Sequence, residues 1–193
     1  MGTLVMIEFL TVDGVMQGLG SPGEDPEGGF VHGGWGAPYA ESVHQVTASS
    51  GFARTSSYLF GRRTYEGMAA YWPTSTDAIA GRMNAIPKIV FSSTLADALW
   101  ANTTLEQGDA VAAVEALKRQ DGGDLFVFGS AELSTSLGAA GLFDEYRIAV
   151  APVILGSGSP LFGRGQPQRT LRLIESRSLA SGGVVLRYQP SGD

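Results

Sequence analysis

The sequence contains no cysteine and only two histidines, His32 and His44. The absence of cysteine excludes disulfide scaffolds, thiolate metal sites, iron–sulfur clusters and thiol nucleophiles. There is no G-x-S-x-G sequence, and few histidines are present to act as bases, so the chain gives little support for nucleophilic catalysis. Glu41 and His44 stand three residues apart on an expected helix, but two ligands are too few for a metal site. A surface ion pair is the favoured interpretation, and no metal is predicted.

Positive charge and long apolar runs are also scarce. Lys and Arg number 13 against 19 Asp and Glu, which gives a net charge of −6 and a pI near 4.9. This balance argues against duplex nucleic acid or an anionic membrane as the main partner. The longest apolar runs, such as residues 148–155, are about eight residues long, whereas a membrane span needs about 20. The amino terminus has no basic leader, so we expect a cytoplasmic protein whose partner is a small-molecule substrate.

Length and composition predict one globular domain over residues 1–193. The chain is 44% hydrophobic and 17% charged, which is ordinary for a folded protein. Its 27 glycines are about twice the usual share, and many directly follow an apolar run. A strand that ends in glycine and leads into a helix is typical of an α/β sheet, where ligands meet the carboxyl ends of the strands.

The apolar patterns predict a fold with a mostly parallel central sheet flanked by helices. Three strands are short continuous apolar runs, as expected when helices cover both faces. Expected strands lie near residues 4–10, 57–60, 88–91, 124–128 and 146–154. Expected helices lie near residues 39–53, 64–71, 74–84, 109–119 and 131–140. Residues 171–178 and 184–188 alternate and flank a Gly-containing turn, which predicts an antiparallel carboxyl-terminal hairpin.

One long segment, Gly18–Pro38, interrupts this pattern with eight glycines, three prolines and an acidic cluster. Long loops inside compact domains are usually functional lids or disordered segments, and we expect a lid. Its first residues match G-x-G-x-x-G, but the prolines and acids that follow forbid the helix that a dinucleotide fingerprint requires. We interpret that match as a coincidence.

Polar groups follow three expected strands where each strand ends. Gly61-Arg62-Arg63-Thr64-Tyr65-Glu66 combines amide donors, two cations and a hydroxyl at the start of a helix, with Thr64 as the expected N-cap. A capped helix with solvated arginines explains the same residues equally well. Ser92-Ser93-Thr94 and Phe128-Gly129-Ser130-Ala131 end two further strands, and each is ambiguous alone. Three strand ends with phosphate-compatible groups are a stronger indication than any one of them.

Taken in order along the chain, these residues resemble the dihydrofolate reductase superfamily. The similarity is closest to its branch related to the reductase (carboxyl-terminal) domain of the bacterial riboflavin-biosynthesis deaminase–reductase. The matching pieces also include Thr11-Val12-Asp13-Gly14, Asp144-Glu145-Tyr146-Arg147 and residues 152–158. The ordered set covers roughly residues 3 to 189.

The resemblance implies that NADPH lies across the strand ends. By this analogy Arg62, Arg63 and Thr64 hold the pyrophosphate and the 2′-phosphate region, with Gly61 as the turn that leads into them. The remaining cofactor contacts would come from Ser92 and Ser93 at the 2′-phosphate side, Gly129, Ser130 and Ala131 at the pyrophosphate, and Phe9 and Met16 beside the nicotinamide. Cations and hydroxyls around an additional phosphate are what NADP selection requires.

The sequence departs from folate reductases at the expected proton donor. Trp35-Gly36-Ala37-Pro38 fits the W-x-x-P pattern of that family, but the acid position is Ala40. Glu41 comes one residue late, which turns it about 100° around a helix. Folate reduction is therefore doubtful unless Glu41, Asp13 or a water molecule supplies the proton. The sequence also contains no zinc deaminase partner domain, so it does not support a role in the riboflavin pathway.

These observations predict an NADPH-dependent reductase of a small pteridine-like or ribosylaminopyrimidine-like heterocycle. The alternative is a catalytically inactive NADP-binding regulatory or interaction module, which Ala40 motivates. The apolar carboxyl-terminal hairpin and family habit together predict a homodimer.

Overall fold

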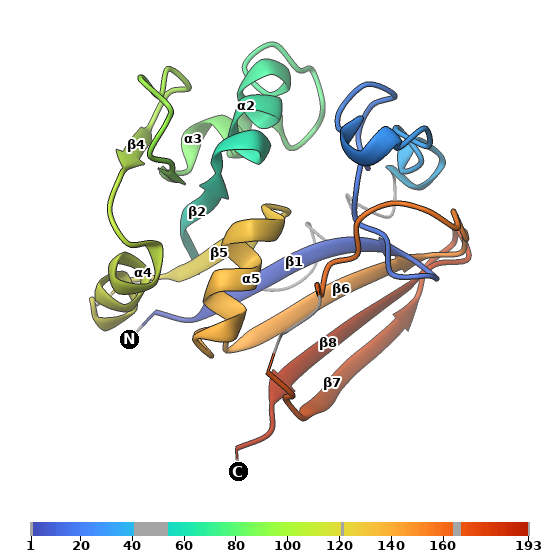
Figure 1. Ribbon diagram of the computed structural model, residues 1–193. Helices are drawn as coiled ribbons and strands as arrows, with labels where there is room; N and C mark the ends of the chain where they lie inside the picture. Colours follow the sequence, from blue (N-terminus) through green and yellow to red (C-terminus); the bar gives the residue numbers. More distant parts are fainter. Residues whose placement is uncertain (1, 41–53, 121, 164–166, 193) are drawn as a thin grey trace. The chain divides into compact units, whose positions relative to one another are not determined.

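The computed structural model describes residues 2–40, 54–120, 122–163 and 167–192 of the chain (Figure 1). Its contacts divide these residues between two compact units. The first comprises residues 1–6 and 51–144, and the second comprises residues 7–50 and 145–193. Strand β1 (Leu4–Thr11) contributes residues to both. The prediction of a single domain over residues 1–193 stays a prediction.

The first unit is built on four parallel strands in the order β4-β3-β2-β5, and β1 follows β5 in the strand order. Their bounds are β2 Thr55–Gly61, β3 Lys88–Phe91, β4 Thr103–Glu106 and β5 Asp124–Phe128. Tyr58, Leu59 and Phe60 are successive residues of β2, and all three are 0% exposed. Consecutive buried residues on a strand require cover on both of its faces. Helices α2 (Arg62–Tyr71) and α5 (Ala131–Ala139) both pack on β2.

Two helices of this unit begin at residues whose chemistry explains the start. Helix α4 (Ala110–Arg119) begins after Asp109, whose side chain accepts a hydrogen bond from the Ala112 amide at 2.9 Å. Helix α2 begins at Arg62 with Gly61 as its N-cap, and no side chain caps it. The prediction that Thr64 is the N-cap was therefore wrong. Thr64 is the third residue of the helix, because the turn that ends β2 passes directly into helical geometry.

Residues 74–84 form a shorter helix than the sequence predicts. Helix α3 covers only Ala80–Ala85. Ser75 accepts a hydrogen bond from the Asp77 amide, and Asp77 accepts one from the Ile79 amide. These local bonds compete with the helical ones and form turns instead. Strand β4 was not predicted at all, because its Thr-Thr-Leu-Glu sequence has no apolar run, and it pairs in parallel with β3.

The second unit contains strands in the order β1-β6-β8-β7. Here β6 covers Glu145–Ala151, β7 covers Leu171–Ser178 and β8 covers Val184–Pro190. Strand β8 is antiparallel to both of its neighbours, and the β7–β8 pair forms the predicted hairpin (Figure 1). The turn closes with the Leu179 amide donating to the Gly183 carbonyl at 2.9 Å, and Gly182 there has a φ of 83°, which favours glycine.

The predicted lid, Gly18–Pro38, has a folded form in this unit. Its two ends lie side by side, since the Gly34 amide donates to the Gly18 carbonyl at 2.7 Å and the Gly36 amide to the Leu19 carbonyl at 3.0 Å. Two short 3-10 turns, η1 (Glu27–Gly29) and η2 (Ala37–Tyr39), are its regular structure among the described residues. Phe30 and Trp35 are buried in a cluster with Val15 and Ala151. The mobility of this segment as a lid stays a prediction.

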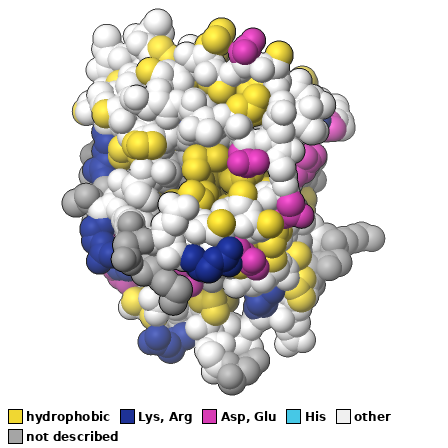
Figure 2. Space-filling model, turned by 90° about the vertical axis from the view of Figure 1, so that its left-hand side faces the viewer, with side chains coloured by type: hydrophobic (Ala, Val, Ile, Leu, Met, Phe, Trp, Pro, Cys, Tyr) yellow, Lys and Arg dark blue, Asp and Glu magenta, His cyan; other side chains and the backbone are white. Residues whose placement is uncertain are grey.

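The fold class is confirmed: the chain is α/β, with a mostly parallel sheet and an antiparallel carboxyl-terminal hairpin. Among the described residues, no helix has the length and apolar character that a membrane crossing requires. On the face drawn in Figure 2, the Lys and Arg side chains lie in small separate groups with acidic side chains nearby. The expected helix over residues 39–53 falls mostly on residues outside the described ranges.

Candidate functional site

In the first unit, the parallel strands β2, β3 and β5 end at neighbouring positions. We call this side of the sheet, where the carboxyl ends of the strands lie, the strand-end edge. Gly61 of β2 is in register with Phe91 of β3, so Arg62 and Ser92 follow adjacent strand ends. Strand β5 pairs with the other side of β2 and leads through Gly129 into α5. The predicted cofactor residues Gly61 to Thr64, Ser92, Ser93 and Gly129 to Ala131 therefore all belong to one edge of this unit.

Ser130 links the ends of β2 and β5 through side-chain hydrogen bonds. Its hydroxyl accepts from the Gly61 amide at 3.0 Å and donates to the Phe128 carbonyl at 3.1 Å. Its own amide donates to the Thr64 hydroxyl at 3.0 Å. The two strand ends are thus held together by two residues that the sequence singled out as ligand contacts.

The backbone before α5 has a conformation that suits an anion. Gly129 and Ser130 both have positive φ, 55° and 59°. A left-handed conformation costs a non-glycine residue about 1–2 kcal/mol, so the surrounding bonds must hold Ser130 in it. Ser134 contributes by donating its hydroxyl proton to the Gly129 carbonyl at 2.9 Å. Successive amides in such a turn, followed by a helix amino terminus, form a concave arrangement of donors that favours negative charge.

The arginines of this edge also have a structural use. Arg62 forms an exposed pair with Glu66 one helical turn later, at 3.1 Å. Ser92 accepts hydrogen bonds from the Thr94 and Leu95 amides at 3.2 and 2.9 Å, which is the geometry of a turn. Arg63 and Ser93 are exposed. The alternative interpretation, a capped helix with solvated arginines, is thus corrected in part: no side chain caps the helix, and Arg62 is paired with Glu66. The interpretation as a phosphate site stays a prediction.

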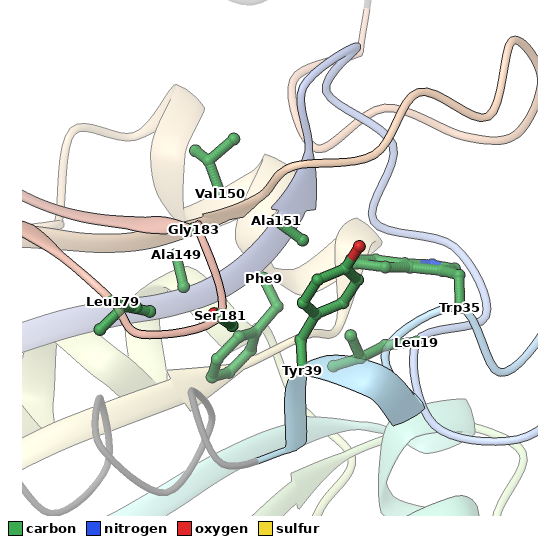
Figure 3. A pocket seen from close by; sticks show the side chains of 10 residues that line it. All are labelled: Phe9, Leu19, Trp35, Tyr39, Ala149, Val150, Ala151, Leu179, Ser181 and Gly183. Atoms are coloured by element: carbon green, nitrogen blue, oxygen red, sulfur yellow. The ribbon is translucent and has the colours of Figure 1, made fainter.

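The second unit contains an apolar pocket whose lining comes from five parts of the unit (Figure 3). Phe9 comes from β1, Leu19 and Trp35 from the predicted lid, and Tyr39 from the residues that follow the lid. Figure 3 shows these four side chains converging on the pocket. The other lining residues are Ala149, Val150, Ala151, Leu179, Ser181 and Gly183. The pocket volume is only about 20 Å³, room for about one water-sized group, so a larger ligand would have to displace side chains.

Asp13, a predicted candidate proton donor, also lies in the second unit. The hydrogen bonds that its carboxylate accepts do not suit that role. Its carboxylate accepts from the Thr11 hydroxyl at 2.6 Å and from the Gly156 and Leu155 amides at 2.8 and 3.2 Å. The Thr11 hydroxyl and these amides lower the pKa of Asp13. An ionised, hydrogen-bonded carboxylate fits a role in tying the β1 turn to residues 155–156 better than a role as an acid. Met16 is half-buried and donates its amide to the Ser159 carbonyl, and Glu41 lies outside the described residues.

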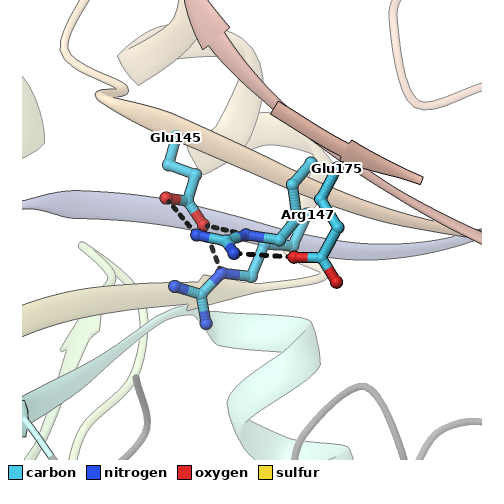
Figure 4. Close-up of polar contacts among 4 residues, drawn as sticks. Glu145, Arg147 and Glu175 are labelled. Carbon is cyan, nitrogen blue, oxygen red and sulfur yellow. Dashed lines mark hydrogen bonds and ion pairs between the residues drawn. The ribbon is translucent and has the colours of Figure 1, made fainter. Parts of the chain in front are cut away.

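A buried charge network of the second unit was missed by the sequence reasoning (Figure 4). Glu145 on β6 accepts hydrogen bonds from Arg147 and, at 3.1 Å to each carboxylate oxygen, from Arg187 on β8. Arg187 also donates to Glu175 at 2.8 Å. Burial acts to raise the pKa of Glu145, but the bonds from Arg187 and Arg147 outweigh it, and the pKa is lowered. The only sequence signal was a pair of charges two residues apart on an otherwise apolar strand.

Comparisons with known proteins agree with this architecture. The sequence profile of the RibD C-terminal domain family matches residues 3–185. The Bacillus subtilis protein YyaP is 29% identical over 143 residues, which cover 69% of this chain and 73% of YyaP. The structure of a putative riboflavin biosynthesis protein from Shewanella sp. PV-4 superposes with a TM-score of 0.70 at 16% identity, over 98% of this chain and 99% of that one. Dihydrofolate reductase from Enterococcus faecalis, complexed with NADP(H), gives a TM-score of 0.63 at 15% identity, over 99% and 98%. At these identities the solved structures show the fold alone.

Proposed function

Because the chain belongs to the RibD C-terminal domain family, we propose that it is an NADPH-dependent reductase that transfers hydride to a small heterocycle, pteridine-like or ribosylaminopyrimidine-like. The observation that carries this proposal is the edge of the first unit where Gly61, Thr64 and Ser130 are hydrogen-bonded together beside two arginines. Members of this fold class include a reductase that was solved with NADP(H).

The residues at this edge fit a dinucleotide that carries a third phosphate. Arg62 and Arg63 supply cations that form bidentate bonds with phosphate oxygens. The first amides of α5, which follow the left-handed turn at Gly129 and Ser130, supply neutral donors for a pyrophosphate, while the Ser130 amide is bonded to the Thr64 hydroxyl. Glycine at position 129 is favoured by its positive φ of 55°, and a Cβ there would be in ordinary van der Waals contact with the Thr64 side chain, at 3.4 Å.

We assign the roles of these residues as follows. Arg62, Arg63 and Thr64 hold the pyrophosphate and 2′-phosphate region, with Ser92 and Ser93 on the 2′-phosphate side and Gly129 to Ala131 on the pyrophosphate. When bound, NADPH supplies a hydride from the C4 position of its nicotinamide. Phe9 and Met16 border the nicotinamide in this proposal. The side chains of the apolar pocket, among them Phe9, Trp35 and Tyr39, move apart to admit the ring of the substrate, pack against it and exclude water from it.

Proton delivery is assigned to water, with Glu41 as the other candidate. Ala40 occupies the position of the acid in folate reductases, and the Asp13 carboxylate is held ionised by its three donors. The described residues that line the pocket contain two hydroxyls, those of Tyr39 and Ser181, and no carboxylate. The reduction therefore depends on binding and orientation for most of its acceleration.

The direct test is a titration of the purified protein with NADPH and with NADH, followed by quenching of tryptophan fluorescence. We expect saturable NADPH binding within the range of ordinary KM values and a clear preference over NADH. No NADPH binding at about 100 μM, or equal binding of both cofactors, would end the proposal.

A second candidate function, an NADP-binding module without catalysis, is favoured by Ala40. It predicts that NADPH binds but that absorbance at 340 nm does not fall with any pterin or pyrimidine supplied. Turnover of a single such compound would eliminate it.

We also propose that the chain forms a homodimer through its carboxyl-terminal hairpin. Leu173 and Ile174 of β7 are 49% and 38% exposed, and β7 is last in the strand order of its unit. Edge strands with exposed apolar side chains are common sites of association. Light scattering should give twice the chain mass of 20.2 kDa, and a mass near 20 kDa would contradict the proposal.

A further inference from the structure

One buried polar side chain in the second unit has no part in the function proposed above. Gln17 lies at the base of the segment 18–38, directly after the β1 turn, and is only 6% exposed. A buried amide group needs partners for both its oxygen and its nitrogen. The partners of Gln17 come from two different loops of the unit.

The nitrogen of the Gln17 side chain holds the inside of segment 18–38. Nε2 donates to the Glu27 carbonyl at 3.0 Å and to the Asp25 carbonyl at 3.2 Å. Both carbonyls lie near the middle of the segment, beside the η1 turn. Asp25 and Glu27 thus take part through their backbone carbonyls, and the side-chain amide of Gln17 donates to both of them.

The oxygen of the same side chain holds a second loop. Oε1 accepts from the Ser159 amide at 2.9 Å. The backbone continues the same connection, since the Met16 amide donates to the Ser159 carbonyl and Val15 pairs with Pro160 in an isolated bridge. Gln17 is therefore the side chain that connects segment 18–38 to residues 159–160.

The Gln17 backbone also fixes one wall of the apolar pocket. The indole nitrogen of Trp35 donates to the Gln17 carbonyl at 2.8 Å. Trp35 and Leu19 line the pocket and lie at the two ends of segment 18–38, which the backbone bonds of Gly34 and Gly36 join. The position of Gln17 and the position of these two walls are therefore coupled.

We propose that Gln17 is a positioning residue: its side chain holds segment 18–38 in the folded form that places Trp35 and Leu19 on the pocket. Its link to a reaction rests on the proposed function, because that proposal assigns the pocket to the substrate. The positioning itself concerns only contacts within the second unit.

Two substitutions at Gln17 distinguish the role of its side-chain nitrogen from that of its side-chain oxygen. Gln17→Met keeps the length of the side chain and removes both the donor and the acceptor. Gln17→Glu keeps an oxygen for the Ser159 amide but places an acceptor against the Asp25 and Glu27 carbonyls. Gln107→Met is the matched control, because Gln107 is an exposed glutamine of the first unit. Thermal unfolding first establishes that each variant is folded.

Nuclear magnetic resonance of ¹⁵N-labelled protein reads the result locally. The chain has three tryptophans, and each indole has its own acceptor: Gln17 for Trp35, Met68 for Trp72 and Asn84 for Trp100. We expect Gln17→Met to shift or broaden the Trp35 indole signal, assigned with Trp35→Phe, and to leave the other two in place. Hydrogen exchange at the Gly34 and Gly36 amides should accelerate at least about tenfold, while the Leu125 amide of the first unit keeps its rate. In Gln17→Glu the same two amides should exchange faster, with the Ser159 amide still protected.

An unchanged Trp35 signal with unchanged exchange at Gly34 and Gly36 in Gln17→Met would overturn the proposal. So would equal shifts of all three indole signals in both variants, because Gln17 would then be a general core contact. NADPH titration of the same samples separates the two proposals. Loss of loop protection without any NADPH binding in the parent protein would refute the cofactor assignment and leave the role of Gln17 standing.

Discussion

The two units contain candidate sites of opposite chemistry. The edge of the first unit offers amides, hydroxyls and two arginines at adjacent strand ends. The pocket of the second unit offers aromatic and aliphatic side chains, among them Phe9, Trp35 and Leu179. The first kind of surface suits a phosphate group, and the second suits a flat apolar ring. Neither kind alone indicates a reductase.

The charges of the two units are also used differently. Arg62 is exposed at the strand-end edge, where its charge is accessible to a ligand. The charges of Glu145 and Arg187 lie inside the second unit and are bonded to one another. An exposed ion pair contributes at most about 1 kcal/mol, whereas the loss of one partner from a buried network leaves an uncompensated charge. The difference predicts that removal of the Arg62 charge affects ligand binding, whereas removal of the Glu145 charge affects stability.

The largest expected effect is on the buried network. Glu145→Ala should lower the free energy of unfolding by about 3–5 kcal/mol, because Arg147 and Arg187 lose their shared carboxylate inside the protein. Glu175→Ala is the control, since Glu175 is an exposed member of the same network, and it should cost less than about 1 kcal/mol. Urea unfolding of the two variants measures both values. Equal losses would mean that burial does not distinguish the two carboxylates.

A smaller effect is expected from a buried lysine of the first unit. Lys88 is 1% exposed, and its ammonium donates to the Asn84 and Ala101 carbonyls at 2.9 Å over the Trp100 ring. Burial lowers the pKa of Lys88 to about 8 from 10.5. Above pH 8 the folded protein loses this proton while the unfolded chain still binds it, so stability rises with pH.

The gain between pH 7 and pH 9.5 is at most about 2 kcal/mol, because the carbonyls and the ring partly favour the charged form. The measurement is urea unfolding across this range for the protein and for Lys88→Met, with the difference between them as the result. The difference should grow in favour of the unsubstituted protein as the pH rises. Parallel curves would show that the pKa of Lys88 is the same in both states.

The effect on the strand-end edge is expected in ligand binding. Arg62→Ala should weaken NADPH binding by about 1–3 kcal/mol, because charged hydrogen bonds to phosphate are lost. Arg119→Ala is the matched control: Arg119 also forms an exposed pair four residues away along a helix, with Glu115 on α4. Both substitutions should cost only about 0.3–0.5 kcal/mol of stability. An unchanged NADPH dissociation constant in Arg62→Ala would move the phosphate site elsewhere.

The outcomes of the sequence predictions follow a physical pattern. Strands β3 and β5 have the predicted bounds, because a continuous apolar run between turn residues is a local signal. The predicted Thr64 cap and the long helix over residues 74–84 were wrong, because short polar side chains form turns and caps that compete with each other locally. Strand β4 was missed because its pairing with β3 stabilises it more than its own sequence does.

In the candidate site too, the features that follow from local sequence were predicted and those that depend on distant contacts were not. Gly61, Ser92 and Gly129 were singled out because each ends an apolar run, and parallel pairing brings such ends to one edge. The bond from the Ser130 amide to the Thr64 hydroxyl joins residues 66 positions apart, and no spacing in the sequence indicates it. The pocket and the Glu145 network were not predicted, since they combine residues from β1, the loop and the hairpin.

By itself, the sequence determined an α/β pattern of strands and helices with glycine, cations and hydroxyls at the strand ends, and only the resemblance of those residues to a known family indicated a reductase. The sequence could determine this pattern because apolar periodicity and turn residues act over a few neighbours. Only the tertiary structure decided that Ser130 joins β2 to β5, that Asp13 is a hydrogen-bonded tie and that Gln17 connects two loops. Those roles depend on which distant backbone groups a side chain meets after folding, and buried polar groups must find partners wherever the packed chain provides them.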